Sequence, residues 1–123
     1  MAGQKMSLLE DQLTTLTDAH TRVIKWLERH GVQLMEEVPF PPYQADIYVP
    51  RFHAVIEVDG PQHSEKDNNR RDLELWTTYQ VPTLRVPHDA TEGRLRGLLL
   101  LLLDFEDDAE TRLASAKLRL PWL

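Results

Sequence analysis

Apolar residues recur at helical spacing from Ser7 to Arg29, and Ser7 with Glu10 has the pattern of an N-terminal capping box. Gly31 follows at the position of a glycine that ends a helix. The chain then has extended character from Val32 to Phe40, until prolines interrupt it. The first third of the chain therefore predicts one long helix, or two short ones, followed by a strand and a loop.

Two strand-like segments, Tyr43 to Val49 and His53 to Val58, flank a short connection and predict a hairpin. With a two-residue turn at Arg51 and Phe52, Asp46 lies opposite Glu57. Because side chains alternate along a strand, the two faces of the hairpin then separate cleanly. One face carries Asp46, Tyr48, Val55, Glu57 and Asp59, and the other carries Ile47, Val49, Ala54, Ile56 and Val58.

The second half of the chain predicts a helix from Ser64 to Tyr79 with Ser64 as its N-cap, and then a strand from Val81 to Val86. A last helical region starts at Thr91 and breaks at 104–108. The expected order is α-β-β-β-α-β-α. It indicates a single α/β domain over residues 1–123 with a mixed sheet, a core at about 19–87 and a C-terminal helical region at about 91–120.

Composition narrows the possible functions. The chain has 123 residues, a net charge of -6 and no cysteine. The charge argues against binding nucleic acid by bulk electrostatics, and the lack of cysteine excludes a thiolate zinc site. The longest apolar run, Leu98 to Leu103, is too short to span a bilayer, and residues 1–6 lack the apolar core of a signal peptide. We therefore expect a cytoplasmic protein without a membrane partner.

The opposed carboxylates of Asp46 and Glu57 need compensation, because like charges directly across two strands destabilise a sheet. A divalent cation such as Mg²⁺ or Mn²⁺ supplies it, since one or two carboxylates, waters and phosphate oxygens are its usual ligands. The alternative is a wet sheet face whose carboxylates only keep the hairpin soluble.

A motif links these carboxylates to a known family. Asp46 is followed by Glu57-Val58-Asp59-Gly60 and then by His63. This spacing resembles the signature of small nucleases related to the very-short-patch-repair endonucleases, in the PD-(D/E)XK superfamily. The similarity runs from about Ala19 to Pro87. A shorter resemblance, to the RAP domains of RNA-associated proteins, covers residues 57–63 and the helix after them.

The nuclease resemblance implies a restriction-endonuclease-like fold and a metal-dependent endonuclease, for which we expect DNA as the substrate, while the resemblance to the RAP domains keeps an RNA substrate open. The nuclease resemblance also implies that Asp46 and Glu57 bind the catalytic metal and that Asp59 is the third member of the site. The superfamily has a lysine at the position of Asp59, which leaves the general base open. Where relatives carry a glutamate on the first helix, this chain has His20.

Other side chains are candidates for catalysis or substrate binding. His63 is a candidate for positioning water or donating a proton, and Gln62 has a similar standing. The basic residues of the helix after the motif, together with one on the last strand, are candidates for phosphate contacts. These four are Lys66, Arg70, Arg71 and Arg85. The alternatives are a solvated helix face and an arginine paired with a carboxylate.

The run Leu98 to Leu103 predicts a helix that is apolar on all sides and must be buried on all sides. It packs either against the first helix or across a homodimer formed by the C-terminal helices. Two other functions stay open. One is a catalytically inactive DNA- or RNA-binding module of the same fold, and the other is a scaffold that assembles through its leucine-rich C-terminus.

Overall fold

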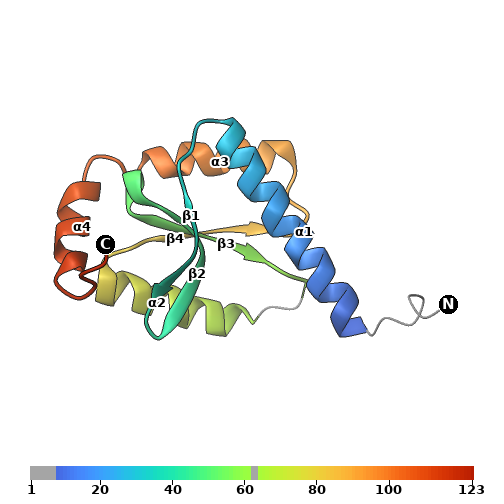
Figure 1. Cartoon of the computed structure of the whole chain (residues 1–123), viewed down its shortest axis with the longest axis horizontal. Helices are drawn as coiled ribbons and strands as arrows, with labels where there is room; N and C mark the ends of the chain where they lie inside the picture. The colour runs from blue at the N-terminus through green and yellow to red at the C-terminus, as the bar shows by residue number, and fades with distance from the viewer. Residues whose placement is uncertain (1–7, 62–63) are drawn as a thin grey trace.

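The computed structural model describes residues 8–61 and 64–123 and has the predicted order of elements (Figure 1). The elements are α1 (Leu8–Arg29), β1 (Met35–Phe40), β2 (Tyr43–Val49), the 3-10 helix η2 (Pro50–Phe52), β3 (Ala54–Asp59), α2 (Glu65–Tyr79), β4 (Thr83–Pro87), α3 (Glu92–Leu103) and α4 (Ala109–Lys117). The last helical region divides into α3 and α4 at the predicted break. The α/β class and the mixed sheet are confirmed.

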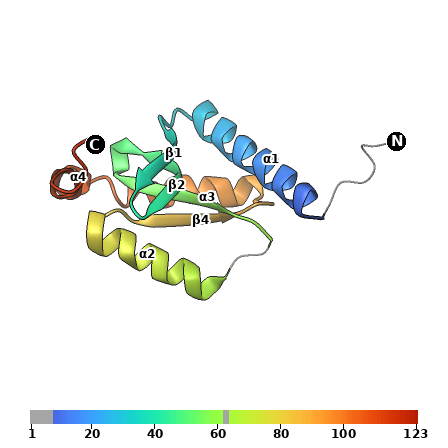
Figure 2. The same ribbon diagram turned by 60° about the horizontal axis from the view of Figure 1, so that its bottom comes forward.

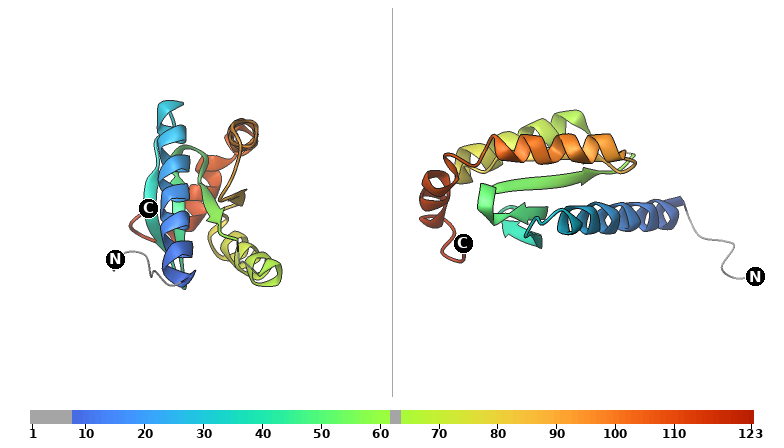
Figure 3. Two further views of the ribbon diagram at one scale, coloured as in Figure 1. Left: turned by 90° about the vertical axis from the view of Figure 1, so that its right-hand side faces the viewer. Right: turned by 90° about the horizontal axis from the view of Figure 1, so that it is seen from above.

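The described residues form one four-stranded sheet in the order β1-β2-β3-β4. β1, β2 and β3 are antiparallel neighbours, and β4 is parallel to β3, with α2 as the crossover helix between them. The sheet separates two apolar clusters, one with residues of α1 and α3 and the other with residues of α2 and α4. Figure 2 shows α1 and α2 on opposite sides of the strands, and the end-on view in Figure 3 shows the same layers.

The predicted register of the hairpin is confirmed, since Tyr48 pairs with Val55 and Ile47 pairs with Ile56. The five residues of the predicted apolar face are all buried in the cluster that α1 and α3 cover. The opposite face is covered as well, because Tyr48 and Val55 lie in the cluster with α2 and α4. The solvated face that the alternative required is therefore absent from this part of the hairpin.

The connection between β2 and β3 differs from the prediction. Residues 50–52 form a 3-10 turn, and His53 follows in the left-handed region with φ 44°. Its N–H donates to the carbonyl of Pro50 at 3.1 Å, which closes the turn before the strand starts at Ala54. The prediction that His53 belongs to the strand is wrong, because this residue closes the turn instead.

Most helix ends follow the sequence. Gly31 has φ 81° after the end of α1, a conformation that glycine adopts without strain. Ser64 caps α2, and its Oγ accepts a hydrogen bond from the N–H of Asp67 at 3.3 Å. The predicted capping box at Ser7 lies outside the described residues.

Within one chain, Leu98 to Leu103 is not buried on all sides, and burial across a homodimer stays a prediction. Leu98 and Leu102 are buried in the cluster that includes residues of α1, whereas Leu100, Leu101 and Leu103 are 67%, 50% and 52% exposed. α4 packs into the other cluster through Ala116. Of the described helices, none has the length and apolar character needed to cross a membrane.

Candidate functional site

The two opposed carboxylates lie where the ladder between β2 and β3 ends. Backbone pairing stops at Ile47 and Ile56, while β2 continues beside β1 and β3 beside β4 (Figure 1). Beyond these residues, hydrogen bonds between side chains and the backbone join the two strands in place of backbone pairing. We call this place the fork; it is formed by Asp46, Glu57 and Val58. The N–H of Asp46 donates to Glu57 Oε2 at 3.0 Å, and the N–H of Val58 donates to Asp46 Oδ2 at 3.0 Å. Each carboxylate is thus fixed by an amide of the opposite strand.

The Glu57 carboxyl is the buried member of the pair, with a side chain only 4% exposed. Burial, a hydrogen bond with the Asp46 side chain and the charge of Asp46 raise the pKa of Glu57 to about 8. The guanidinium of Arg71 and the N–H of Asp46 lower this pKa, but they do not offset burial and the neighbouring carboxylate. The Glu57 carboxyl therefore keeps its proton to a higher pH than an ordinary glutamate does.

Arg71 of α2 reaches across to the fork and forms an ion pair with Glu57 Oε1 through its Nη2. The same nitrogen donates to the carbonyl of Gln44 at 2.6 Å, and the guanidinium lies over the Tyr43 ring at 5.2 Å from its centroid. The Tyr43 hydroxyl donates in turn to Glu74. Arg71 was predicted as a phosphate contact, and its position beside Glu57 adds a second role.

The first helix also contributes to the fork. His20 Nε2 lies 3.5 Å from Asp46 Oδ2, and both side chains are a little over a quarter exposed. This nitrogen is itself buried and has no hydrogen-bond partner within the described part of the chain. The predicted first-helix position is therefore brought to the carboxylate pair, next to Asp46.

Asp59 takes part in a second group of charges, centred on Arg85, which pairs with Glu57 in the ladder between β3 and β4. Arg85 donates to Asp59 Oδ1 at 2.6 Å and to both carboxylate oxygens of Asp72 at 2.6 and 2.9 Å. The arginine paired with carboxylates, which was the alternative for Arg85, is the arrangement observed. The carboxylate at the third position of the motif is thus held by a cation of the protein.

The remaining candidates lie at the start of α2 and before it. Lys66 is exposed in the first turn, and Arg70 is exposed and paired with Glu74 at 3.2 Å. Gln62 and His63 lie outside the described residues, so their predicted roles stay predictions.

Tyr43 and Gln44 were not anticipated from the sequence. They hold Arg71 in place, but no spacing rule connects the start of β2 with one particular arginine of α2. The only signal was indirect, since both residues precede Asp46 on the same predicted strand.

The donor set fits a hard divalent cation held by two carboxylates. Residues 8–61 and 64–123 contain no group of three or more His, Asp or Glu side chains arranged to hold a metal ion. Mg²⁺ usually binds one or two carboxylates, keeps several waters and takes phosphate oxygens from its substrate. Among the carboxylate oxygens of the fork, Asp46 Oδ1 accepts no hydrogen bond from a backbone amide or a guanidinium of the described residues. The fork thus matches an ion that the substrate helps to bind.

Comparisons with known proteins add no family to this picture. No family model matches the chain, and no curated protein matches it. The resemblance to the PD-(D/E)XK nucleases therefore stays a prediction, based on the motif residues themselves.

Proposed function

We propose that this protein is a metal-dependent endonuclease that hydrolyses phosphodiester bonds in DNA, with Asp46 and Glu57 as the ligands of Mg²⁺ or Mn²⁺. The observation that carries the proposal is the fork. Two carboxylates are held face to face by backbone amides of opposite strands, and one of them is almost fully buried. Arg71 offsets the cost of this pair only in part, because the pKa of Glu57 stays raised beside it, so the position of the pair is more readily explained by binding than by stability.

The chemistry of a bound divalent ion is polarisation of the scissile phosphate and supply of hydroxide near neutral pH. Arg71 orients the Glu57 carboxylate and places a fixed positive charge beside it, where negative charge develops on the phosphate. His20 has a buried imidazole nitrogen next to Asp46, where it can accept a proton or return it. Asp59 is engaged by Arg85 and supports the strand rather than the fork.

The surface beside Arg71 supports a nucleic acid as the substrate. A hollow of about 320 Å³ is lined by Tyr43, Asp67, Asn68, Arg70 and Arg71. Arginine and asparagine donors next to an aromatic ring suit the phosphates and bases of a nucleic acid strand. The net charge of -6 disfavours sequence-blind binding, which supports a special DNA structure such as a nick, flap, mismatch or junction as the substrate.

Two expectations from the sequence belong to this proposal. An enzyme of this kind works on intracellular DNA, so a cytoplasmic location is part of it. A homodimer through the C-terminal helices would present two forks, as an enzyme that cuts both strands or a branched substrate requires.

A binding module without catalysis is the second candidate, and Arg71 is the observation that favours it. Its guanidinium already neutralises part of the charge on Glu57, which is what the cation would otherwise do. The aspartate in place of the superfamily lysine points the same way. In that case the carboxylates of the fork have no catalytic function, and the hollow beside Arg71 binds nucleic acid that is not cleaved.

Cleavage assays separate the two candidates. Labelled duplex, nicked, flapped, mismatched, four-way and single-stranded DNA and RNA are incubated with the protein in Mg²⁺, Mn²⁺ or EDTA. We expect cutting in Mg²⁺ or Mn²⁺ but not in EDTA, and a loss of at least about a hundredfold in Asp46→Asn and Glu57→Gln. Glu36→Gln is the matched control, because it removes one exposed carboxylate from the same sheet and leaves the fork intact.

Titration calorimetry with Mn²⁺ gives the second readout. Heat of binding that disappears in Asp46→Asn but stays in Glu36→Gln supports the metal site. Nucleic acid binding with neither Mn²⁺ uptake nor cleavage would establish the binding module instead. Indifference to every nucleic acid would refute both candidates and leave the scaffold.

A further inference from the structure

The outward face of α3 carries a ridge that no part of the described chain covers. Arg96, Leu100 and Asp104 follow one another at intervals of four residues, so they lie along one side of the helix, which Asp104 C-caps. Leu100 is 67% exposed at the centre of this ridge, and Leu103 beside it is 52% exposed. Three exposed leucines on one helix form a larger apolar surface than isolated surface leucines do.

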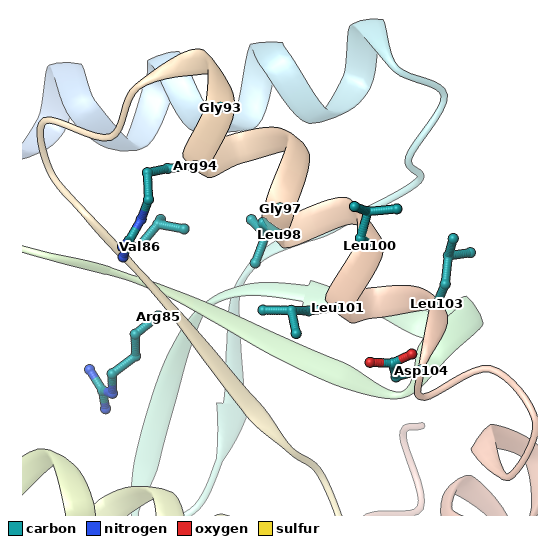
Figure 4. Close-up of a pocket in the computed structure, with 10 residues that line it drawn as sticks. All are labelled: Arg85, Val86, Gly93, Arg94, Gly97, Leu98, Leu100, Leu101, Leu103 and Asp104. Carbon is teal, nitrogen blue, oxygen red and sulfur yellow. The ribbon is translucent and has the colours of Figure 1, made fainter.

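A groove runs beside the ridge, because the neighbouring positions are glycines. It has a volume of about 790 Å³ and lies between α3 and β4 (Figure 4). Gly93 and Gly97 form part of its lining, and a Cβ atom built on Gly97 would meet no other atom within 4 Å. The space beside Gly97 is therefore open and can accept the side chains of another helix.

The charges on the ridge are arranged symmetrically about Leu100. Arg96 lies four residues before this leucine and Asp104 four residues after it. Arg96 has only a long contact of 3.6 Å with Glu92, and both of these side chains are more than half exposed. No side chain in residues 18–61 and 64–123 pairs with the carboxylate of Asp104. Both charges are therefore available to a partner.

We infer that this face of α3 binds a second copy of the same chain, with the two helices antiparallel about a two-fold axis at Leu100. The two-fold axis at Leu100 places the ridges of the two helices against each other. In this arrangement Leu100 meets Leu100 of the partner subunit, and Arg96 of each copy lies beside Asp104 of the partner subunit.

The pattern selects a second copy over a different protein. A two-fold axis places each position before Leu100 opposite the equivalent position after it. The face is therefore complementary to itself about this axis. Four residues from Leu100 an arginine meets an aspartate of the other copy, and three residues from Leu100 Gly97 meets a leucine of the other copy. A single helix pair buries a small area, so we expect a weak dimer that depends on concentration.

Charge reversal tests the arrangement. Sedimentation velocity over a wide concentration range is measured for the unmodified chain, Arg96→Asp, Asp104→Arg and the double variant. Each single reversal puts like charges together at both ends of the interface, and we expect it to weaken association by about tenfold or more. The double variant restores opposite charges and should recover most of the affinity. Asp107→Arg is the control, because it reverses an exposed carboxylate outside the ridge.

The outcomes are distinct from those of the nuclease proposal, because each monomer contains a complete fork. Circular dichroism confirms that the variants fold, which is expected since both positions are exposed. A chain that stays monomeric at the highest concentration would overturn the inference. A dimer that ignores both single reversals, or that the double variant fails to restore, would overturn it too.

Discussion

The two ends of the β2–β3 hairpin both bury ionisable side chains, but they satisfy them in opposite ways. At the turn, His53 is fully buried, and its imidazole hydrogen-bonds to two neutral groups. Its Nδ1 accepts a hydrogen bond from the Tyr48 hydroxyl at 2.7 Å, and its Nε2 donates to the carbonyl of Tyr79 at 3.0 Å. At the fork, the buried carboxyl of Glu57 faces another carboxylate instead.

Arg112 completes the turn end. It is 4% exposed, and its two terminal nitrogens donate to four carbonyl oxygens at 2.8 to 3.0 Å. These belong to Phe52, His53, Gln80 and Phe105. A single side chain of α4 thus binds the hairpin turn to the segments that follow α2 and α3.

The difference between the ends separates a structural role from a binding role. At the turn, the buried polar groups already have hydrogen-bond partners, and the His53 ring is held in one tautomer. A ligand bound there would therefore relieve no unfavourable interaction. Opposed like charges leave an unfavourable interaction at the fork that a cation or a proton relieves. A buried ionisable group therefore suggests a site only where its own partners fail to compensate it.

The largest expected effect comes from breaking the turn end. Arg112→Met removes the hydrogen bonds to four carbonyls and leaves buried acceptors unpaired, so we expect a loss of roughly 3 kcal/mol or more in the free energy of unfolding. Denaturant unfolding measures this loss. Arg119→Met, an exposed arginine two residues after α4, is the control and should change stability by less than about 0.5 kcal/mol. Similar values for the two variants would contradict the role assigned to Arg112.

The second effect concerns the fork and depends on pH. The pKa of Glu57 is raised from 4.5 to about 8, so the folded protein keeps a proton that the unfolded chain releases across this range. The free energy of unfolding should therefore fall as pH rises from about 4.5 to 8, by at most about 1.4 kcal/mol per pH unit. In Glu57→Gln this contribution disappears, and the variant should be more stable than the parent above pH 8 without metal. An unchanged slope in the variant would argue against the opposed pair.

The smallest effect lies at the turn and has the opposite sign. Burial, with a smaller contribution from Arg112, lowers the pKa of His53 below its ordinary value of 6.5. The unfolded chain therefore binds a proton at this histidine more readily, and stability is lost as pH falls below about 6.5. Thermal unfolding of His53→Gln should show a weaker loss on acidification than the parent chain. If the parent loses no more than the variant, His53 is not held neutral.

Local patterns in the sequence predicted much of the fold. Alternation of apolar residues predicted the strand register, and Gly31 and Ser64 marked helix ends by their own backbone preferences. His53 could not be placed in the same way, because its left-handed backbone depends on the 3-10 turn before it. The burial of only half of α3 was also hidden, since a run of leucines does not reveal which side meets the sheet.

The candidate site was predictable only where one hairpin contains it. The strand spacing placed Asp46 opposite Glu57, and the resemblance to the PD-(D/E)XK nucleases pointed to His20, which lies beside Asp46. The ion pair between Arg71 and Glu57 joins α2 to β3 and depends on how the helix packs across the sheet. The ion pairs of Arg85 with Asp59 and Asp72 depend on the same packing.

The two backbone amides of the fork give the molecule a built-in spectroscopic reporter. The N–H groups of Asp46 and Val58 donate directly to carboxylate oxygens of the pair. Any change in the charge of those oxygens alters the shielding of the two amide protons. Cation uptake at the fork would thus be visible as movement of two resonances in an amide correlation spectrum, whether or not a substrate is cut.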